Sequence, residues 1–156
     1  MIRPHAIIAL LIVGLGIVTV SGCTSAPAPN HEWSDRMTAL LSDPSGQGGA
    51  GGVLSVDNGA KSANGVVELA SVPSGEYDVL AVCTGAGTVH IVIKTSASHG
   101  KVLNSSDIAC GATLRLPITT AAPGIAFEAA SNGTPAQWQA ALVTPGWGPT
   151  PTTYSR

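Results

Sequence analysis

Apolar residues recur at every second position in several short runs between residues 53 and 143. In one clear run, Val89, Ile91 and Ile93 fall on one face, and Thr88, His90 and Lys94 fall on the other. Alternation of this kind places one face of a strand in a core and the other in water. Turn residues such as Asn132-Gly133 separate the runs. About seven or eight such runs predict an all-β domain over residues 53–143, an antiparallel β-sandwich of jelly-roll or immunoglobulin-like topology.

Two cysteines lie in the middle of this pattern. Strand-like runs cover Glu76–Cys83 and Thr88–Thr95, and Cys110 precedes a third run at Ala112–Thr119. Strand parity places Cys83 and Cys110 on inward faces, so we expect a disulfide between them. Closing a loop of this length contributes about 3–4 kcal/mol in the chain-entropy model. That is a large share of the net stability of a domain, about 5–15 kcal/mol. The disulfide matters more here because a core with a single Phe contains few large apolar side chains.

Further expectations concern where the strands pair and end. Residues 76–83 carry apolar side chains on both faces, which favours a central strand or one covered by an N-terminal helix. Gly85-Ala86-Gly87 predicts a hairpin between this strand and the next. Ser96–Ala109 is polar, and we expect turns there, including one at Asn104–Asp107. Pro117 has no N–H for a sheet ladder, so its strand is expected at an edge.

The N-terminus has the features of an export signal. Arg3 supplies a positive charge, and residues 6–20 are apolar apart from two glycines and a threonine. A run of this length, followed by small residues, is typical of a signal peptide rather than of a stable membrane span. Residues 1–22 are therefore expected to be absent from the mature protein. An uncleaved anchor, or cleavage at another small residue, is the alternative.

The four residues Val20-Ser21-Gly22-Cys23 resemble the lipobox of bacterial lipoproteins. The resemblance implies that Cys23 is acylated and becomes the first residue of the mature chain, with Val20 in place of the more usual Leu. Each buried CH₂ group contributes about 0.8 kcal/mol to membrane attachment. We therefore expect a lipid-anchored protein on the extracytoplasmic face of the cell membrane. Disulfides persist there, which leaves Cys83 and Cys110 as a pair.

A tether, a helix and a linker are expected between the anchor and the sandwich. Residues 23–30 form the tether, which is rich in Ala, Pro and Ser. Residues 31–52 contain an amphipathic helix, His31–Ser42, and a glycine-rich linker. One face of this helix, which packs on the domain or alternatively on the membrane, carries Trp33, Met37, Leu40 and Leu41. After the sandwich, residues 144–156 are rich in Pro and Thr and are expected to form an extended or disordered tail.

We expect no catalytic site, metal or cofactor, because no motif in the chain predicts one. The string Gly46-x-Gly48-x-x-Gly51 matches the dinucleotide fingerprint, but a helix and a proline precede it and a strand follows, so we interpret it as linker. His90, His99 and Asp107 could assemble a site in space, yet they lack the spacing of metal ligands. Two exposed histidines are the simpler interpretation.

Charge and aromatic content narrow the class of partner. Charged residues make up 10% of the chain and the net charge is −2, which excludes the basic surface of a nucleic-acid-binding protein. Tyr77, Phe127 and Trp138 fall on inward faces and Trp33 falls on the packed face of the helix. Only Trp147 and Tyr154 therefore remain for a sugar-binding platform. The sequence therefore predicts a binding or interaction module for an envelope polymer or protein. A structural envelope protein and, less favoured, a hydrolase of envelope polymers are the alternatives.

The body of the chain resembles small actinobacterial lipoproteins over residues 65–143. Three stretches carry the likeness: Gly75–Val92, Ile108-Ala109-Cys110-Gly111 and Gln137-Trp138-Gln139. The resemblance implies no activity and no site residues, so the lipobox remains the one specific motif.

Overall fold

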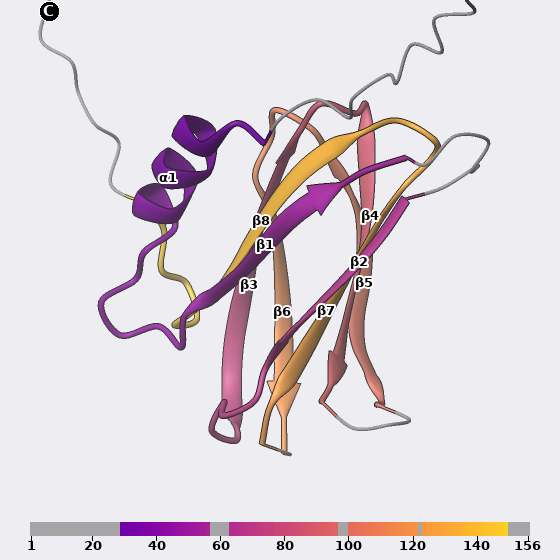
Figure 1. Ribbon diagram of the computed structural model, residues 1–156. Helices are drawn as coiled ribbons and strands as arrows, with labels where there is room; N and C mark the ends of the chain where they lie inside the picture. Colours follow the sequence, from indigo (N-terminus) through magenta and orange to yellow (C-terminus); the bar gives the residue numbers. More distant parts are fainter. Residues whose placement is uncertain (1–28, 57–62, 97–99, 122, 150–156) are drawn as a thin grey trace, which may run out of the picture.

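The computed structural model describes residues 29–56, 63–96, 100–121 and 123–149, which form a β-sandwich with one helix (Figure 1). Eight antiparallel strands lie in two sheets, the first in the order β1-β8-β3-β6 and the second in the order β2-β7-β4-β5. The strands are β1 (Gly49–Leu54), β2 (Ala63–Leu69), β3 (Gly75–Thr84), β4 (Thr88–Thr95), β5 (Val102–Ala109), β6 (Leu114–Thr120), β7 (Ile125–Ser131) and β8 (Ala136–Val143). The predicted all-β sandwich is confirmed. Outside the described residues lie the expected signal peptide (1–22), Cys23, His99 and Tyr154.

The strand pairing is nested: β1 pairs with β8, β2 with β7, β3 with β6 and β4 with β5. Nested pairing of this kind is jelly-roll topology, one of the two that the sequence left open. It sends the chain to the other sheet at most connections, and only β4 and β5 are neighbours in both sequence and sheet. The hairpin predicted at Gly85-Ala86-Gly87 is therefore wrong. Both sides of β3 are occupied, by β8 and β6, so β4 has no free side of β3 to pair with.

The main core fills the space between the two sheets with the residues that the alternation places inward. Phe127 of β7 and Trp138 of β8 are its largest buried side chains. On β4, the fully buried residues are Val89, Ile91 and Ile93, as the alternation predicts. Burying one such side chain contributes about 1.5–3 kcal/mol. This core is what holds the two sheets together.

A second apolar cluster lies on the outer face of the first sheet. Its buried members are Leu41, Leu80, Val82, Ala141 and Val143, and its partly buried members are Trp33, Met37 and Trp147. β3 is therefore buried on both faces, which confirms both features predicted for residues 76–83, a central position and cover from the N-terminal helix. Leu40 was expected on the apolar face of the helix but is 39% exposed, whereas the next residue, Leu41, is buried in this cluster.

The helix α1 (His31–Leu40) lies along the outer face of the first sheet, beside β8 (Figure 1). Asn30 caps its N-terminus, and the Asn30 side chain accepts a hydrogen bond from the Trp33 N–H at 3.1 Å. The helix ends at Leu40 rather than at Ser42, the end that the sequence predicts. The expected amphipathic helix therefore forms, and its apolar side packs on the domain.

The predicted Cys83–Cys110 disulfide is present, with the two Cα atoms 4.6 Å apart. Cys83 lies near the end of β3 and Cys110 directly follows β5, so the bond joins the first sheet to the second. Two backbone hydrogen bonds of 3.1 Å flank it, from the Cys110 N–H to Gly87 O and from the Gly111 N–H to Cys83 O. The bond therefore ties together the two layers where the chain crosses between them.

The strand β5 occupies residues that were expected to turn. It forms one edge of the second sheet, so the turn predicted at Asn104–Asp107 is wrong. An edge strand tolerates polar residues because one of its sides is open to water. Asn104 also uses its amide, whose Nδ2 donates to Pro117 O at 2.8 Å and links β5 to β6. Pro117 itself lies on β6, which is an edge strand as predicted.

The segment predicted as a glycine-rich linker is in part a strand. β1 begins at Gly49, so the sandwich begins there rather than at Val53. A Cβ atom at Gly49 would lie 2.6 Å from Ala140 O, and one at Gly51 would lie 2.9 Å from Trp138 O. Real Cβ atoms essentially never make contacts this short. Glycine is therefore required here by the close approach of β1 to β8, and not by flexibility.

We predict that Gly49→Ala lowers the free energy of unfolding by about 1–3 kcal/mol, the usual cost of overpacking. Gly87→Ala is the matched control, because a Cβ atom at Gly87 meets nothing within 4 Å and its φ is not positive. That control is expected to change stability by less than about 1 kcal/mol. Urea unfolding of the disulfide-bonded protein measures both. Equal effects of the two substitutions would contradict the close-approach explanation.

Candidate functional site

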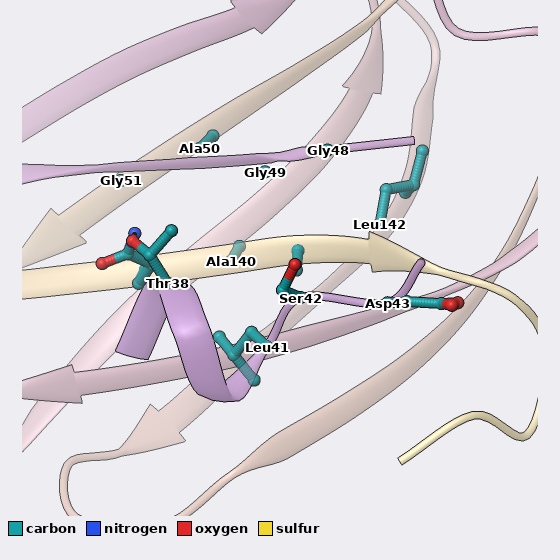
Figure 2. Close-up of a pocket in the computed structure, with 12 residues that line it drawn as sticks. Thr38, Leu41, Ser42, Asp43, Gly48, Gly49, Ala50, Gly51, Ala140 and Leu142 are labelled. Carbon is teal, nitrogen blue, oxygen red and sulfur yellow. Dashed lines mark hydrogen bonds between the residues drawn. The ribbon is translucent and has the colours of Figure 1, made fainter. Parts of the chain in front are cut away.

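A groove runs along the outer face of the first sheet, between α1 and β1. It contains two cavities, of about 220 and about 350 Å³, which share Gly51 and Gln139. The smaller cavity lies toward the C-terminal end of α1, beside Thr38 and Ser42 (Figure 2). The larger lies toward the N-terminal end of the helix, beside Pro29. We refer to the two together as the α1–β1 groove.

The groove exists because α1 is held to one side of β1. Trp33 and Met37 pack on the second apolar cluster, whose other members belong largely to β3 and β8. β1 presents Gly49 and Gly51, which have no side chains, on its outer face. Figure 2 shows these glycines along one side of the groove and Thr38 of the helix along the other. The result is a floor of β1 and β8 backbone with one wall of helix side chains.

Two glutamines of β8 fix the helix beside the groove. Gln139 accepts a hydrogen bond from Ser34 Oγ at 3.2 Å and donates one to Thr38 Oγ1 at 2.5 Å. Gln137 accepts a bond from the Asn30 N–H at 3.0 Å and donates a longer one, 3.4 Å, to Asn30 O. The alternation of β8 places both glutamines outward, as predicted. What the sequence does not reveal is that they hold the helix along its length.

Asp43 closes the C-terminal end of the groove. Its Oδ2 accepts hydrogen bonds from the N–H and the Oγ1 of Thr144, both at 2.8 Å, and its Oδ1 accepts one from the Ser45 N–H at 2.9 Å. Loss of hydration raises the pKa of the Asp43 carboxyl, but the hydrogen bonds from Thr144 and Ser45 outweigh it and the pKa lies below its ordinary value. The carboxylate therefore acts as a structural acceptor that ties the entry of β1 to the end of β8.

Asp78 and Arg115 fix residues 144–149 on the same face. Asp78 is only 7% exposed, and its Oδ2 accepts hydrogen bonds from the Gly146 N–H at 2.8 Å and from Arg115 Nη1. Arg115 Nη2 donates to Trp147 O at 2.6 Å. The bond from Gly146, opposed by burial and assisted by Arg115, lowers the pKa of the Asp78 carboxyl. The expectation of an extended tail from residue 144 is therefore wrong for 144–149, and residues 150–156 lie outside the described residues.

His90 and Asp107 meet on the outer face of the second sheet. Their side chains are directly opposite on β4 and β5, with His90 Nδ1 2.7 Å from Asp107 Oδ1. Both are solvent-exposed, at 49% and 69%. Within the described part of the chain, no three His, Cys, Asp or Glu side chains are grouped as metal ligands would be. The structure thus brings together two of the three residues considered for a site, and His99 lies outside the described ranges.

The aromatic side chains that the structure describes are all packed. The main core contains Tyr77, Phe127 and Trp138, as predicted. Trp33 and Trp147 pack against the second apolar cluster. In residues 29–56, 63–96, 100–121 and 123–149 there is therefore no exposed aromatic platform of the kind suited to sugar rings.

Neither protein-family models nor curated proteins give a match to this chain. Within the described ranges, no helix has the length and apolar character needed to cross a membrane. The case for a function therefore depends on the sequence motifs and on the geometry of the α1–β1 groove.

We predict that Asp78→Asn lowers the free energy of unfolding by about 2 kcal/mol at neutral pH. Hydrogen bonds to a charged group contribute about 1.5–3 kcal/mol, and the partial exposure of Arg115 reduces this range. Since the folded-state pKa of Asp78 lies below the unfolded value of about 3.9, the contribution is present above that value and is lost as the pH falls through the folded pKa.

Urea unfolding at several pH values measures this effect. The stability difference between wild type and Asp78→Asn should narrow on acidification, and Asp35→Asn, which alters an exposed carboxylate on α1, is the charge-matched control. A difference that stays constant from neutral pH down to about pH 2 would show that the carboxylate charge contributes nothing to the fold.

Proposed function

We propose that this protein is a lipid-anchored binding module on the extracytoplasmic face of the cell membrane, and that the α1–β1 groove receives its partner. The groove is the observation that carries the binding role. The side chains of Gln137 and Gln139 hold the helix beside it, and its larger cavity of about 350 Å³ falls within the usual size of ligand sites. The lipobox ending in Cys23 and the Cys83–Cys110 bond support an exported, anchored protein.

The position of the groove suits an anchored protein. Pro29 lines its N-terminal end and lies six positions after Cys23. A chain spans at most about 3.5 Å per residue, so this end of the groove lies within roughly 20 Å of Cys23. A partner held there is therefore close to the membrane surface.

The chemistry of the groove favours an uncharged partner surface. Most polar side chains along its wall are hydroxyls and amides, such as Ser34 and Gln139, with the imidazole of His31 at the N-terminal end. The carboxylate of Asp43 is occupied by hydrogen bonds from Thr144 and Ser45. With a net charge of −2, the chain has no electrostatic attraction for nucleic acid. An envelope protein or an uncharged envelope polymer fits these features, and no cofactor is part of the proposal.

A structural envelope protein is the second candidate, and the outer face of the second sheet favours it. No described helix or tail covers this face, and Val66 is 60% exposed there. A hydrolase is the third and weakest candidate, because it rests only on the exposed His90–Asp107 pair. The two leading candidates differ in which face of the sandwich meets a partner, and this can be measured.

We predict that a clickable fatty acid fed to bacteria that produce the full chain labels the wild-type protein and not Cys23→Ala. Acyl chains on Cys23 are the proposed attachment, so Cys23→Ala should also appear in the soluble fraction rather than in membranes. Cys83→Ser/Cys110→Ser is the control that removes cysteines but keeps the lipobox, and it should retain the label. An unlabelled wild type, or label retained by Cys23→Ala, would remove the anchor from the proposal.

We predict that a photo-crosslinking amino acid in place of Ser42, at the groove, captures a partner in intact cells. Ser105 is the matched control, because it is also an exposed serine but lies on β5 of the second sheet. A binding role in the groove requires adducts from position 42 and few from position 105. The reverse pattern would favour the structural candidate and would exclude the groove.

A further inference from the structure

The two sheets end in four edge strands, and β1 is the least protected of them. The edges are β1 and β6 in the first sheet and β2 and β5 in the second. Edge strands expose unpaired N–H and C=O groups, and charged residues or prolines normally block them. β6 contains Arg115 and Pro117, β2 contains Glu68, and β5 contains Asp107. β1 has the sequence Gly-Ala-Gly-Gly-Val-Leu and contains neither a charge nor a proline.

Within the described residues, β1 is hydrogen-bonded on one side only, to β8, and β2 of the second sheet is the element that lies near its other side. Ala50 and Leu54 point into the main core, whereas Gly49, Gly51 and Val53 belong to the outer face and are exposed. α1 packs beside β8, and in the part of the chain that the structure describes the outer face of β1 stays exposed. Because the outer-face glycines have no side chains, the α1–β1 groove is open sideways at this edge.

We infer that β1 accepts an extended segment of a partner polypeptide as a fifth strand of the first sheet. This inference rests on the proposed binding function and names the class of partner. Main-chain hydrogen bonds to the open edge would supply affinity, and alternate side chains of the added strand would supply specificity. Those on the outer face lie beside Gly49 and Gly51, where a large apolar side chain can reach over the glycines into the groove.

A second copy of the same chain is a poorer occupant of this edge. Pairing β1 with another β1 would set glycines next to glycines, whereas cross-strand side-chain pairs contribute about 0.2–1 kcal/mol each. Val53 is the one exposed large apolar residue that β1 would bring to such a dimer, at 39% exposure. The neutral wall of Ser34, Thr38 and Gln139 likewise suits an uncharged segment. The partner is therefore a different polypeptide that alternates small or polar residues with large apolar ones.

The test uses the detergent-solubilised full chain and a fluorescent seven-residue peptide of alternating Thr and Phe. Fluorescence anisotropy should detect saturable binding at or below millimolar peptide. Two further peptides carry N-methyl groups on alternate residues, one set on the Thr amides and the other on the Phe amides. Strand addition uses the N–H groups of every second residue, so one methylated peptide should bind about tenfold more weakly or not at all, while the other keeps its affinity.

Val53→Lys places a charge on the β1 edge and should weaken binding of the unmethylated peptide about tenfold. Val102→Lys makes the same change at an exposed valine on the β5 edge and should leave binding unchanged. Val53→Thr, which adds no charge at the same position, should weaken binding less than Val53→Lys does. Circular dichroism and urea unfolding of the three variants check that each is folded.

Several results would overturn the inference. These are no binding of the unmethylated peptide, equal binding of both methylated peptides, or an equal effect of Val53→Lys and Val102→Lys. If the peptide does not bind, and the protein instead forms a concentration-dependent dimer that Val53→Lys abolishes, then the partner of the β1 edge is a second copy of the chain. If the peptide does not bind but crosslinked adducts still form from position 42, strand addition to β1 is wrong and the proposed binding function stands. If neither peptide binding nor adducts are detected, the proposed function is wrong as well.

Discussion

β3 is buried on both of its faces, and the arrangement of the remaining chain follows from this constraint. Its outer residues Leu80 and Val82 require apolar cover, which α1 and Trp147 provide. Its buried carboxylate, Asp78, requires donors, and these come from Gly146 and Arg115. Because α1 is positioned by its contacts over β3 and β8, it leaves β1 open. The α1–β1 groove is therefore a consequence of where the helix finds its apolar partners.

The disulfide has a corresponding role between the layers. A jelly roll sends the chain repeatedly from one sheet to the other, so most of its contacts join residues distant in sequence. The Cys83–Cys110 bond joins the two sheets beside the crossing from β3 to β4. Its expected contribution of about 3–4 kcal/mol matters in a domain whose core contains one Phe and many alanines. An oxidising compartment suits a chain that depends on such a bond.

Period-two alternation was enough to predict the sandwich, the inward residues, the disulfide and the edge position of Pro117, because each follows from strand parity or from a missing N–H. The alternation gave wrong predictions where one residue type is compatible with two different local structures. Glycine signals flexibility and also close approach, and at Gly49 the second applies. Polar residues signal turns and also edge strands, which is why a turn is predicted at Asn104–Asp107 where β5 continues. The groove gave no signal, because it arises from the placement of α1 and not from any motif.

The two hydrogen bonds between the Asn30 backbone and the Gln137 side chain also determine where a force on the N-terminal chain first meets the sheet. A force applied to the chain ahead of Pro29 reaches the fold first at Asn30, whose N–H and C=O are both bound by the Gln137 side chain. Gln137 belongs to β8, which is flanked by β1 and β3 within its sheet. Through these bonds the chain ahead of the helix connects directly to an interior strand of the first sheet, with hydrogen-bonded neighbours on both sides, rather than to an edge strand.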